Sequence, residues 1–178
     1  MTDKQRQIID TALQLFAHQG YASTSTSKIA QQAGVSEGLI FRHFTNKEGL
    51  LEAIVRMGLE EMRTIAPSVL DEQDPKVRLE QAIRVPLYLV RHHPTFWKLQ
   101  FSLKHQQPNL AERYDDSDIL TQLKAAVEGT FRELGYANPK AETKLLMIIL
   151  SGLMIELGEE DQIDQDALIN FVLQKYQL

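Results

Sequence analysis

The side chains best suited to chemistry stand close together in one short segment. Arg42 carries a guanidinium fork that matches the two acceptors on the edge of guanine, and the same group also fits a phosphate. Glu37 can accept a hydrogen bond from the amino group of cytosine, although a favourable charge at a helix start is the simpler interpretation. Leu39 and Phe41 offer apolar contacts to thymine methyl groups. Together with Gly38, these residues predict a surface that contacts the base edges of DNA.

These side chains need a rigid support, and the surrounding sequence has the pattern of two short helices joined by a tight turn. Ala30 is small enough for a close helix crossing, and Gly34 supplies the turn. Val35 and Ile40 can fill the space between the two helices, and Ser36 is a good N-cap for the second. The pattern predicts a helix-turn-helix, whose second helix fits the major groove while neighbouring hydroxyl groups and cations hold phosphates.

The rest of the chain is also predicted to be helical, because apolar residues recur every three to four positions and no strand-like alternation is sustained. The first helix is expected to end at Gly20. Thr45 and Glu48 have capping-box spacing, which predicts a fourth helix from there to Pro67, and Pro86 is expected to kink the fifth. The fifth and later helices are expected at residues 75–93, 95–104, 117–134, 139–158 and 166–176. This pattern predicts an all-α protein.

The composition excludes several classes of protein. The chain has 178 residues, 43% hydrophobic and 24% charged, which fits one large or two small globular domains and not a disordered chain. The absence of cysteine excludes a disulfide scaffold and a thiolate metal site, and it favours a cytoplasmic protein. The first residues lack the apolar stretch of a signal peptide, and the most apolar segment, residues 145–157, is too short to cross a bilayer. We therefore expect no membrane partner.

The charge is distributed unevenly along the chain. The formal net charge is −5. Residues 1–58 hold six lysine and arginine residues against five acidic residues, a net of +1, whereas the remainder holds 13 against 19, a net of −6. A nearly neutral N-terminal region releases few counterions from DNA, so we expect binding to depend on a dimer that reads two half-sites.

A longer pattern surrounds the helix-turn-helix. Its pieces are Ala12-Leu13-x-Leu15-Phe16, Gly20-Tyr21 followed by Thr24, Ile29-Ala30, Ala33-Gly34-Val35-Ser36, Phe44, Lys47-Glu48 and Leu50-Leu51. Over residues 9–55 this pattern resembles, without a gap, the N-terminal DNA-binding region of transcriptional regulators of the TetR/AcrR family. The resemblance implies that residues 1–47 form a helix-turn-helix DNA-binding domain. It also implies that residues 48–178 form a helical effector-binding and dimerisation domain.

The resemblance also implies the partners of the protein. Members of the family bind a palindromic operator in double-stranded DNA as homodimers, usually as repressors, which places this chain at the bacterial nucleoid. The implied DNA contacts are Thr26, Ser27, Lys28, Ser36, Glu37, Gly38, Leu39, Phe41, Arg42, His43 and Lys47. Leu39 and Phe41 stand where the family often has threonine and tyrosine, so hydroxyl contacts are lost and the operator sequence cannot be carried over. Lys47 is expected to clamp a phosphate.

A dimer interface is expected near the C-terminus. Residues 145–157 are apolar nearly all round, as expected of a helix buried both in its own domain and against a second subunit, and the alternative is a purely internal helix. In TetR-like proteins the last two long helices of each subunit form a four-helix bundle at the dimer interface. The expected interface residues are Leu145, Ile149, Gly152, Leu153, Glu156, Leu168, Val172 and Tyr176.

The resemblance further implies a small-molecule effector bound in the second region. Aromatic and apolar residues near Pro86 suggest a cavity for a hydrophobic or aromatic molecule, although each of them also fits an ordinary core. The candidates are Met62, Leu87, Tyr88, Trp97, Phe101, Phe131 and Met147. Effector entry would pull the fourth helix and change the separation of the two recognition helices. The alternative is a DNA-binding regulator controlled by a protein partner or by no effector.

No cofactor, metal site or enzymatic activity is expected. His92 and His93 are adjacent and face different sides of a helix, and the acidic residues between 159 and 166 lack the spacing of a calcium loop. The motifs of nucleotide-binding enzymes, zinc proteases and serine hydrolases do not occur. A helical adaptor that has lost DNA binding is a further alternative. The residues that argue against it are Ser27, Arg42, His43 and Lys47.

Overall fold

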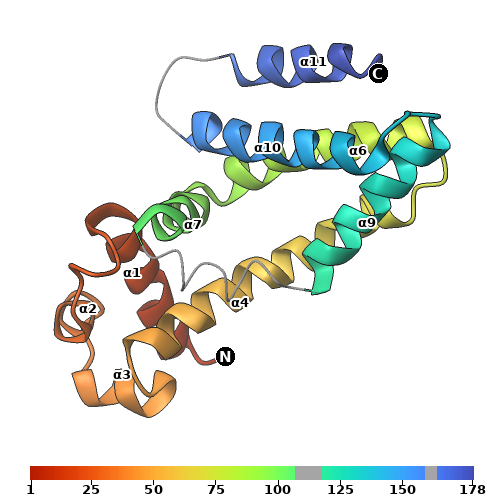
Figure 1. The fold of residues 1–178 in the computed structure, drawn as a ribbon. Coiled ribbons are helices and arrows are strands. Elements are labelled where there is room, and N and C mark those ends of the chain that lie inside the picture. The colour runs from red at the N-terminus through yellow and green to blue at the C-terminus, as the bar shows by residue number, and fades with distance from the viewer. Residues whose placement is uncertain (107–117, 159–163) are drawn as a thin grey trace. The chain divides into compact units, whose positions relative to one another are not determined.

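The protein is helical throughout the part that the computed structural model describes, residues 1–106, 118–158 and 164–178 (Figure 1). It divides into two compact units. The head unit comprises the described residues 1–60 and 98–106, and the C-terminal unit comprises the others. The predicted domain boundary after residue 47 falls inside the head unit, at the start of a helix. Within the described ranges, no helix combines the length and the apolar character needed to cross a membrane.

The head unit is built from short N-terminal helices whose ends follow local sequence signals. Its elements are α1 (Asp3–Gln19), α2 (Thr26–Gln32), α3 (Glu37–Phe44), α4 (Lys47–Ile65) as far as residue 60, and α7 (Pro94–Gln106) from residue 98. The side chain of Ser25 caps α2 by accepting a hydrogen bond from the backbone N–H of Lys28. Gly20 ends α1 with a φ of 86°, which confirms the predicted end of the first helix.

The start of α4 differs from its predicted cap by one residue. The side chain of Asn46 accepts a hydrogen bond of 2.8 Å from the backbone N–H of Gly49. Thr45 ends α3 with a φ of 68°, in the left-handed region, whereas an N-cap residue has extended backbone. The predicted capping box between Thr45 and Glu48 is therefore wrong, because the chain turns sharply at Thr45.

This sharp turn makes Gly49 a position where no side chain fits. A Cβ atom there would lie 2.1 Å from the carbonyl oxygen of Phe44, which belongs to the backbone and cannot rotate away. We expect Gly49→Ala to lower the free energy of unfolding by roughly 1–3 kcal/mol and the melting temperature by about 5 °C. Thermal unfolding measures the change. Gly129→Ala is the matched control because a Cβ at that position in α9 meets open space, and equal melting temperatures for the two variants would contradict the account.

The C-terminal unit is organised around one long helix. Its elements are α5 (Pro67–Leu70), α6 (Pro75–His92), α9 (Asp118–Glu133), α10 (Pro139–Gly158) and α11 (Gln165–Lys175), together with short stretches of α4 and α7. The other four helices pack against α6 or against one another, and Figure 1 shows α10 running alongside α6. Asp74 caps α6, whose first residue is Pro75, the predicted start, and the helix continues through Pro86. The four-residue α5 was not predicted, since Pro67 was expected only to end α4.

Candidate functional site

Two short helices, α2 and α3, form the helix-turn-helix that the sequence predicts (Figure 1). The turn places Gly34 at a φ of 61°, a conformation that glycine adopts at no steric cost. Ile29 of α2 and Ile40 of α3 are fully buried and anchor both helices in the head unit. Because its buried side is fixed in this way, α3 leaves a set of residues on the surface, namely Gly38, Phe41 and Arg42.

The side chains of Arg42 and Phe41 are available to a partner. Arg42 is exposed and makes no hydrogen bond or ion pair with another residue in the described part of the chain. Its guanidinium can therefore bind a guanine edge or a phosphate without breaking an internal contact. Phe41 leaves 46% of its surface exposed, and its ring can contact a thymine methyl group. These positions agree with the surface predicted from the sequence.

The other residues predicted to contact DNA differ in their exposure and in their hydrogen bonds. Ser27, Lys28 and Ser36 are exposed, and the ammonium group of Lys28 donates to Oε1 of Gln19 at 2.5 Å. Leu39 is half-buried. The half-buried Thr26 and Glu37 are bonded to each other, because Oγ1 of Thr26 donates to Oε1 of Glu37 at 2.6 Å.

Lys47 has an internal role that the sequence did not predict. Its Nζ atom donates to the carbonyl oxygens of Tyr21 at 3.0 Å and Thr24 at 3.1 Å, and it lies 4.3 Å from the centroid of the Tyr21 ring. Burial lowers the pKa of the Lys47 ammonium group below its usual value. Two of its three donors are therefore used to tie the loop before α2 to the start of α4. The third donor is left for a phosphate, so the expected phosphate contact of Lys47 stays a prediction.

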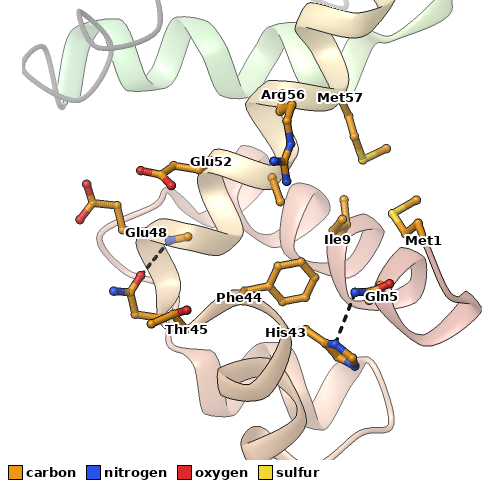
Figure 2. Close-up of a pocket in the computed structure, with 13 residues that line it drawn as sticks. Met1, Gln5, Ile9, His43, Phe44, Thr45, Glu48, Glu52, Arg56 and Met57 are labelled. Carbon is orange, nitrogen blue, oxygen red and sulfur yellow. Dashed lines mark hydrogen bonds between the residues drawn. The ribbon is translucent and has the colours of Figure 1, made fainter.

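His43 is directed partly toward the interior of the head unit. Its Nδ1 atom lies 3.4 Å from Nε2 of Gln5 on α1, a contact drawn in Figure 2. The ring lines an open groove of about 730 Å³ formed by the start of α1, the end of α3 and the first turns of α4. Phe44, one of the residues of the family pattern, is half-buried and lies in the middle of this groove (Figure 2). Sequence patterns could not reveal the groove, because its residues come from separate segments.

The predicted effector-binding residues are distributed over both units. Leu87 and Phe131 are buried in the core of the C-terminal unit, and Trp97 and Met147 pack against that core. Met62 is also buried in the C-terminal unit, whereas Phe101 belongs to the head unit. Tyr88 was expected in a cavity but is 41% exposed, and its ring stacks on that of His92 at a centroid distance of 4.0 Å. The helix turns Tyr88 outward, away from the core that holds Leu87, and its place in an effector site stays a prediction.

Two polar atoms of the C-terminal unit are buried without a partner among the described residues. They are Nε1 of Trp97 and Oη of Tyr176. The Tyr176 ring packs against Phe131 at a centroid distance of 5.7 Å, and burial, with a smaller contribution from the charge of Glu142, raises the pKa of Tyr176 to about 12. Buried polar groups are normally hydrogen-bonded, so these two atoms are candidates to bind a polar group of a ligand.

The residues predicted at a dimer interface divide between the surface and the core. Leu145, Gly152 and Glu156 are exposed, and Ile149 and Leu168 are half-buried. Leu153, Val172 and Tyr176 are at most 6% exposed and belong to the core of their own unit, which corrects their assignment to an interface. They were misassigned because a helix that is apolar nearly all round gives no periodic signal for its outward side.

Two apolar side chains that the prediction missed are the most exposed on these helices. Ile148 on α10 is 60% exposed, and Phe171 on α11 is 68% exposed. Ile148 lies three residues after Leu145 and four before Gly152, so it shares their side of α10. This spacing of exposed apolar residues was the signal that could have identified the outward side.

The histidine and acidic residues make contacts that do not require a metal. Nδ1 of His92 lies 2.8 Å from the carbonyl oxygen of Tyr88, and Nε2 of His93 lies 3.3 Å from Oε1 of Glu61. Among the described residues, no group of three histidine or acidic side chains is placed to hold a metal ion. Residues 159–163 of the acidic segment lie outside the described residues.

The N-terminal region is similar to known regulatory proteins. Residues 8–54 match the family model described as bacterial regulatory proteins, tetR family. The uncharacterized HTH-type transcriptional regulator YvkB of Bacillus subtilis is 47% identical over 55 residues, 31% of this chain and 29% of that protein. The fatty acid metabolism regulator protein of the same organism is 34% identical over 120 residues, 67% of this chain and 52% of that protein. The chain therefore spans less than two thirds of the length of these relatives.

Solved structures share the fold over nearly the whole chain. The transcriptional regulator FadR from Bacillus subtilis in complex with stearoyl-CoA has a TM-score of 0.76 at 22% identity, covering 95% of each chain. The fatty acid degradation regulator FadR from Bacillus halodurans has a TM-score of 0.74 at 23% identity, covering 98% of this chain and 94% of that one. The predicted all-α fold, with an N-terminal helix-turn-helix and a helical C-terminal part, is confirmed. By this fold and by the match over its helix-turn-helix, the chain belongs to the tetR family of bacterial regulatory proteins.

Proposed function

We propose that the protein is a sequence-specific DNA-binding transcriptional regulator, acting as a repressor at the bacterial nucleoid. The observation that carries the proposal is the exposed side of α3, where Arg42 has no partner among the residues that the structure describes and Phe41 is open to contact. A helix of this kind fits the major groove, where arginine and apolar side chains distinguish base pairs. Ser27, Lys28 and Ser36 stand exposed nearby in the sequence and can bind phosphates.

The proposal includes binding as a homodimer to an inverted repeat. Exposed Leu145 and Ile148 on α10 and Phe171 on α11 are large apolar side chains that a second subunit would remove from water. The four-helix bundle implied by the family resemblance uses these two helices. Two heads would then read two half-sites, which compensates for the small number of basic residues in each head.

The experiment that tests this function is selection of random duplex DNA by the purified protein at moderate salt, followed by sequencing of the enriched pool. We expect enrichment of an inverted repeat with half-sites about one helical turn apart or slightly more. A pool without any enriched sequence would contradict the proposal. The whole chain of 178 residues is used, because both units contribute to the expected binding.

We further propose that a small hydrophobic effector of the fatty-acyl class releases the protein from DNA. One curated relative is a fatty acid metabolism regulator protein, and one structural neighbour contains stearoyl-CoA. Nε1 of Trp97 and Oη of Tyr176, which have no partner among the described residues, belong to side chains that lie in or pack against the hydrophobic core of the C-terminal unit. An apolar molecule with one hydrogen-bonding group matches that combination.

Replacing Tyr176 by phenylalanine should stabilise the protein in the absence of ligand. The change removes a buried hydroxyl that has no partner in the described part of the chain, and we expect a gain of about 1 kcal/mol, which raises the melting temperature by roughly 2–4 °C. Wild-type protein should also lose stability as the pH rises from 10 toward 12, because the unfolded tyrosine ionises before the folded one. The variant lacks this contribution.

Thermal unfolding at neutral and alkaline pH measures both effects, and Tyr136→Phe is the matched control. The Tyr136 ring packs against the same Phe131 at a centroid distance of 5.0 Å, but Tyr136 is only half-buried. Titration with stearoyl-CoA, followed by Trp97 emission, should show weaker binding for Tyr176→Phe than for the control. A lower melting temperature for Tyr176→Phe would show that the hydroxyl already has a partner.

A further inference from the structure

A hydrogen bond between Thr26 and Glu37 joins the first residue of α2 to the first residue of α3. The two oxygen atoms are 2.6 Å apart, a distance typical of a hydroxyl that donates to a carboxylate. Both side chains are half-buried, and both belong to the helix-turn-helix that would face DNA. Within the described residues, Glu37 forms no ion pair with a lysine or arginine.

This bond is not needed to complete either helix. The side chain of Ser25 already caps α2 through the backbone N–H of Lys28, so the Thr26 hydroxyl is left for another use. A glutamate at a helix start is stabilised by the helix dipole wherever its side chain points. The dipole therefore explains a negative charge at position 37, but it does not explain why the carboxylate binds the neighbouring helix.

The hydroxyl of Thr26 has a single proton to donate. A carboxylate and a DNA phosphate both accept that proton, and neither can donate one in return. A phosphate that takes the hydroxyl of Thr26 must therefore displace the carboxylate of Glu37. The displaced carboxylate is then negatively charged beside DNA, and it needs a donor. In the major groove such a donor is the amino group of a base, and glutamate pairs best with N4 of cytosine.

We propose that Glu37 is a specificity-determining residue that reads a cytosine amino group once a backbone phosphate has taken the hydroxyl of Thr26. The inference rests on the proposed DNA-binding function. It links phosphate contact to base reading, because Glu37 stays bonded to Thr26 until a phosphate is in place. In the free protein the carboxylate of Glu37 would therefore stay bonded to Thr26. The free-energy cost of breaking that bond would be offset only at DNA sites that present the amino group of cytosine.

The test compares base preferences selected from random duplex DNA by wild-type protein and by Glu37→Gln. Glutamine can still accept the hydroxyl proton of Thr26, so a residue that only positions Thr26 would leave the base preference unchanged. As a base reader, glutamine prefers adenine. We expect one symmetric pair of positions to change from cytosine to adenine, with about a tenfold or greater change in relative enrichment.

Asp10→Asn is the matched control, since Asp10 is an exposed acid on α1 of the same unit and the substitution removes the same charge. It should not change the base preference. Thr26→Val removes the phosphate donor and should weaken binding to all sequences by a similar factor while keeping the preference for cytosine. Melting temperatures confirm that each variant is folded.

An enriched operator that is the same for wild type and Glu37→Gln would overturn the inference while leaving the proposed function intact. Loss of the cytosine preference in Thr26→Val would also overturn it, because it would show that Glu37 needs the hydroxyl to read the base. If wild-type protein enriched no sequence at all, the proposed function would fail first and the inference with it. The wild-type pool tests the proposed function and the pools of the two variants test the inference, so the two failures are distinguishable.

Discussion

Replacing Ile148 by glutamate should convert the protein to monomers and reduce operator binding by a factor of about 1,000 or more. Ile148 is 60% exposed on α10, so the carboxylate costs the fold of one chain little. In a dimer that buries this side of α10, the same carboxylate would lose its water without gaining a partner. That costs about 3–5 kcal/mol in each of the two copies. Without a dimer, each head reads only one half-site.

Sedimentation velocity measures the change in mass, and fluorescence anisotropy with a labelled operator measures the change in affinity. Val77→Glu is the matched control because Val77 is another exposed aliphatic residue of the C-terminal unit, 38% exposed at the start of α6. The control should remain dimeric. A dimeric Ile148→Glu variant with normal operator binding would show that α10 does not form the interface.

Replacing Arg42 by alanine should weaken operator binding by about 10- to 100-fold and relax the base preference at one symmetric pair of positions. Arg42 has no partner within the described residues, so its removal costs the fold little. The loss therefore reports the contact with DNA. Competition between the operator and duplexes changed at single positions, measured by anisotropy, identifies the bases involved.

The control for this variant is Arg6→Ala, which removes the same charge from the exposed side of α1 in the same unit. It should lower the affinity for every sequence slightly and leave the base preference unchanged. If Arg42→Ala weakened all sequences by the same factor, Arg42 would contact a phosphate and would not read a base. An unchanged affinity would remove Arg42 from the interface.

The sequence was sufficient to predict the elements of the head unit because their signals are local. Gly34 needs a left-handed turn, and Ile29 and Ile40 lie on the buried sides of α2 and α3. Ser36 occupies the predicted N-cap position of α3, although its side chain makes no cap hydrogen bond. The predicted start of α4 was wrong by one residue, because threonine and asparagine are both common N-caps and Asn46, next to Thr45, is the residue that caps the helix. The exposed positions of Arg42 and Phe41 follow from the same local pattern, because burying one side of α3 leaves the residues on its opposite side exposed.

Contacts between distant segments could not be predicted in this way. The charge of Lys47 was plain from the sequence, but the carbonyl oxygens of Tyr21 and Thr24 that it binds are brought near only by folding. The pairing of Thr26 with Glu37 has the same origin. Each residue type was consistent with a contact to DNA, and the choice between an internal and an external partner depends on distances that no spacing rule supplies.

The C-terminal unit shows a further limit of sequence patterns. Residues 145–157 are apolar on nearly every side, so periodicity could not separate the inward Leu153 from the outward Ile148. Aromatic residues were grouped into one cavity by type, yet Tyr88 is on the surface and Trp97 packs on the core. Burial in this unit depends on how α9, α10 and α11 pack on α6.

The central claim is that two copies of α3 read two half-sites together. The most direct measurement is the mass of the complex between the full-length protein and its selected operator, compared with binding to a duplex that contains one half-site. We expect two or four chains on the full operator and affinity for the half-site at least about 100-fold weaker. One chain on the full operator, or equal affinity for the half-site, would contradict it.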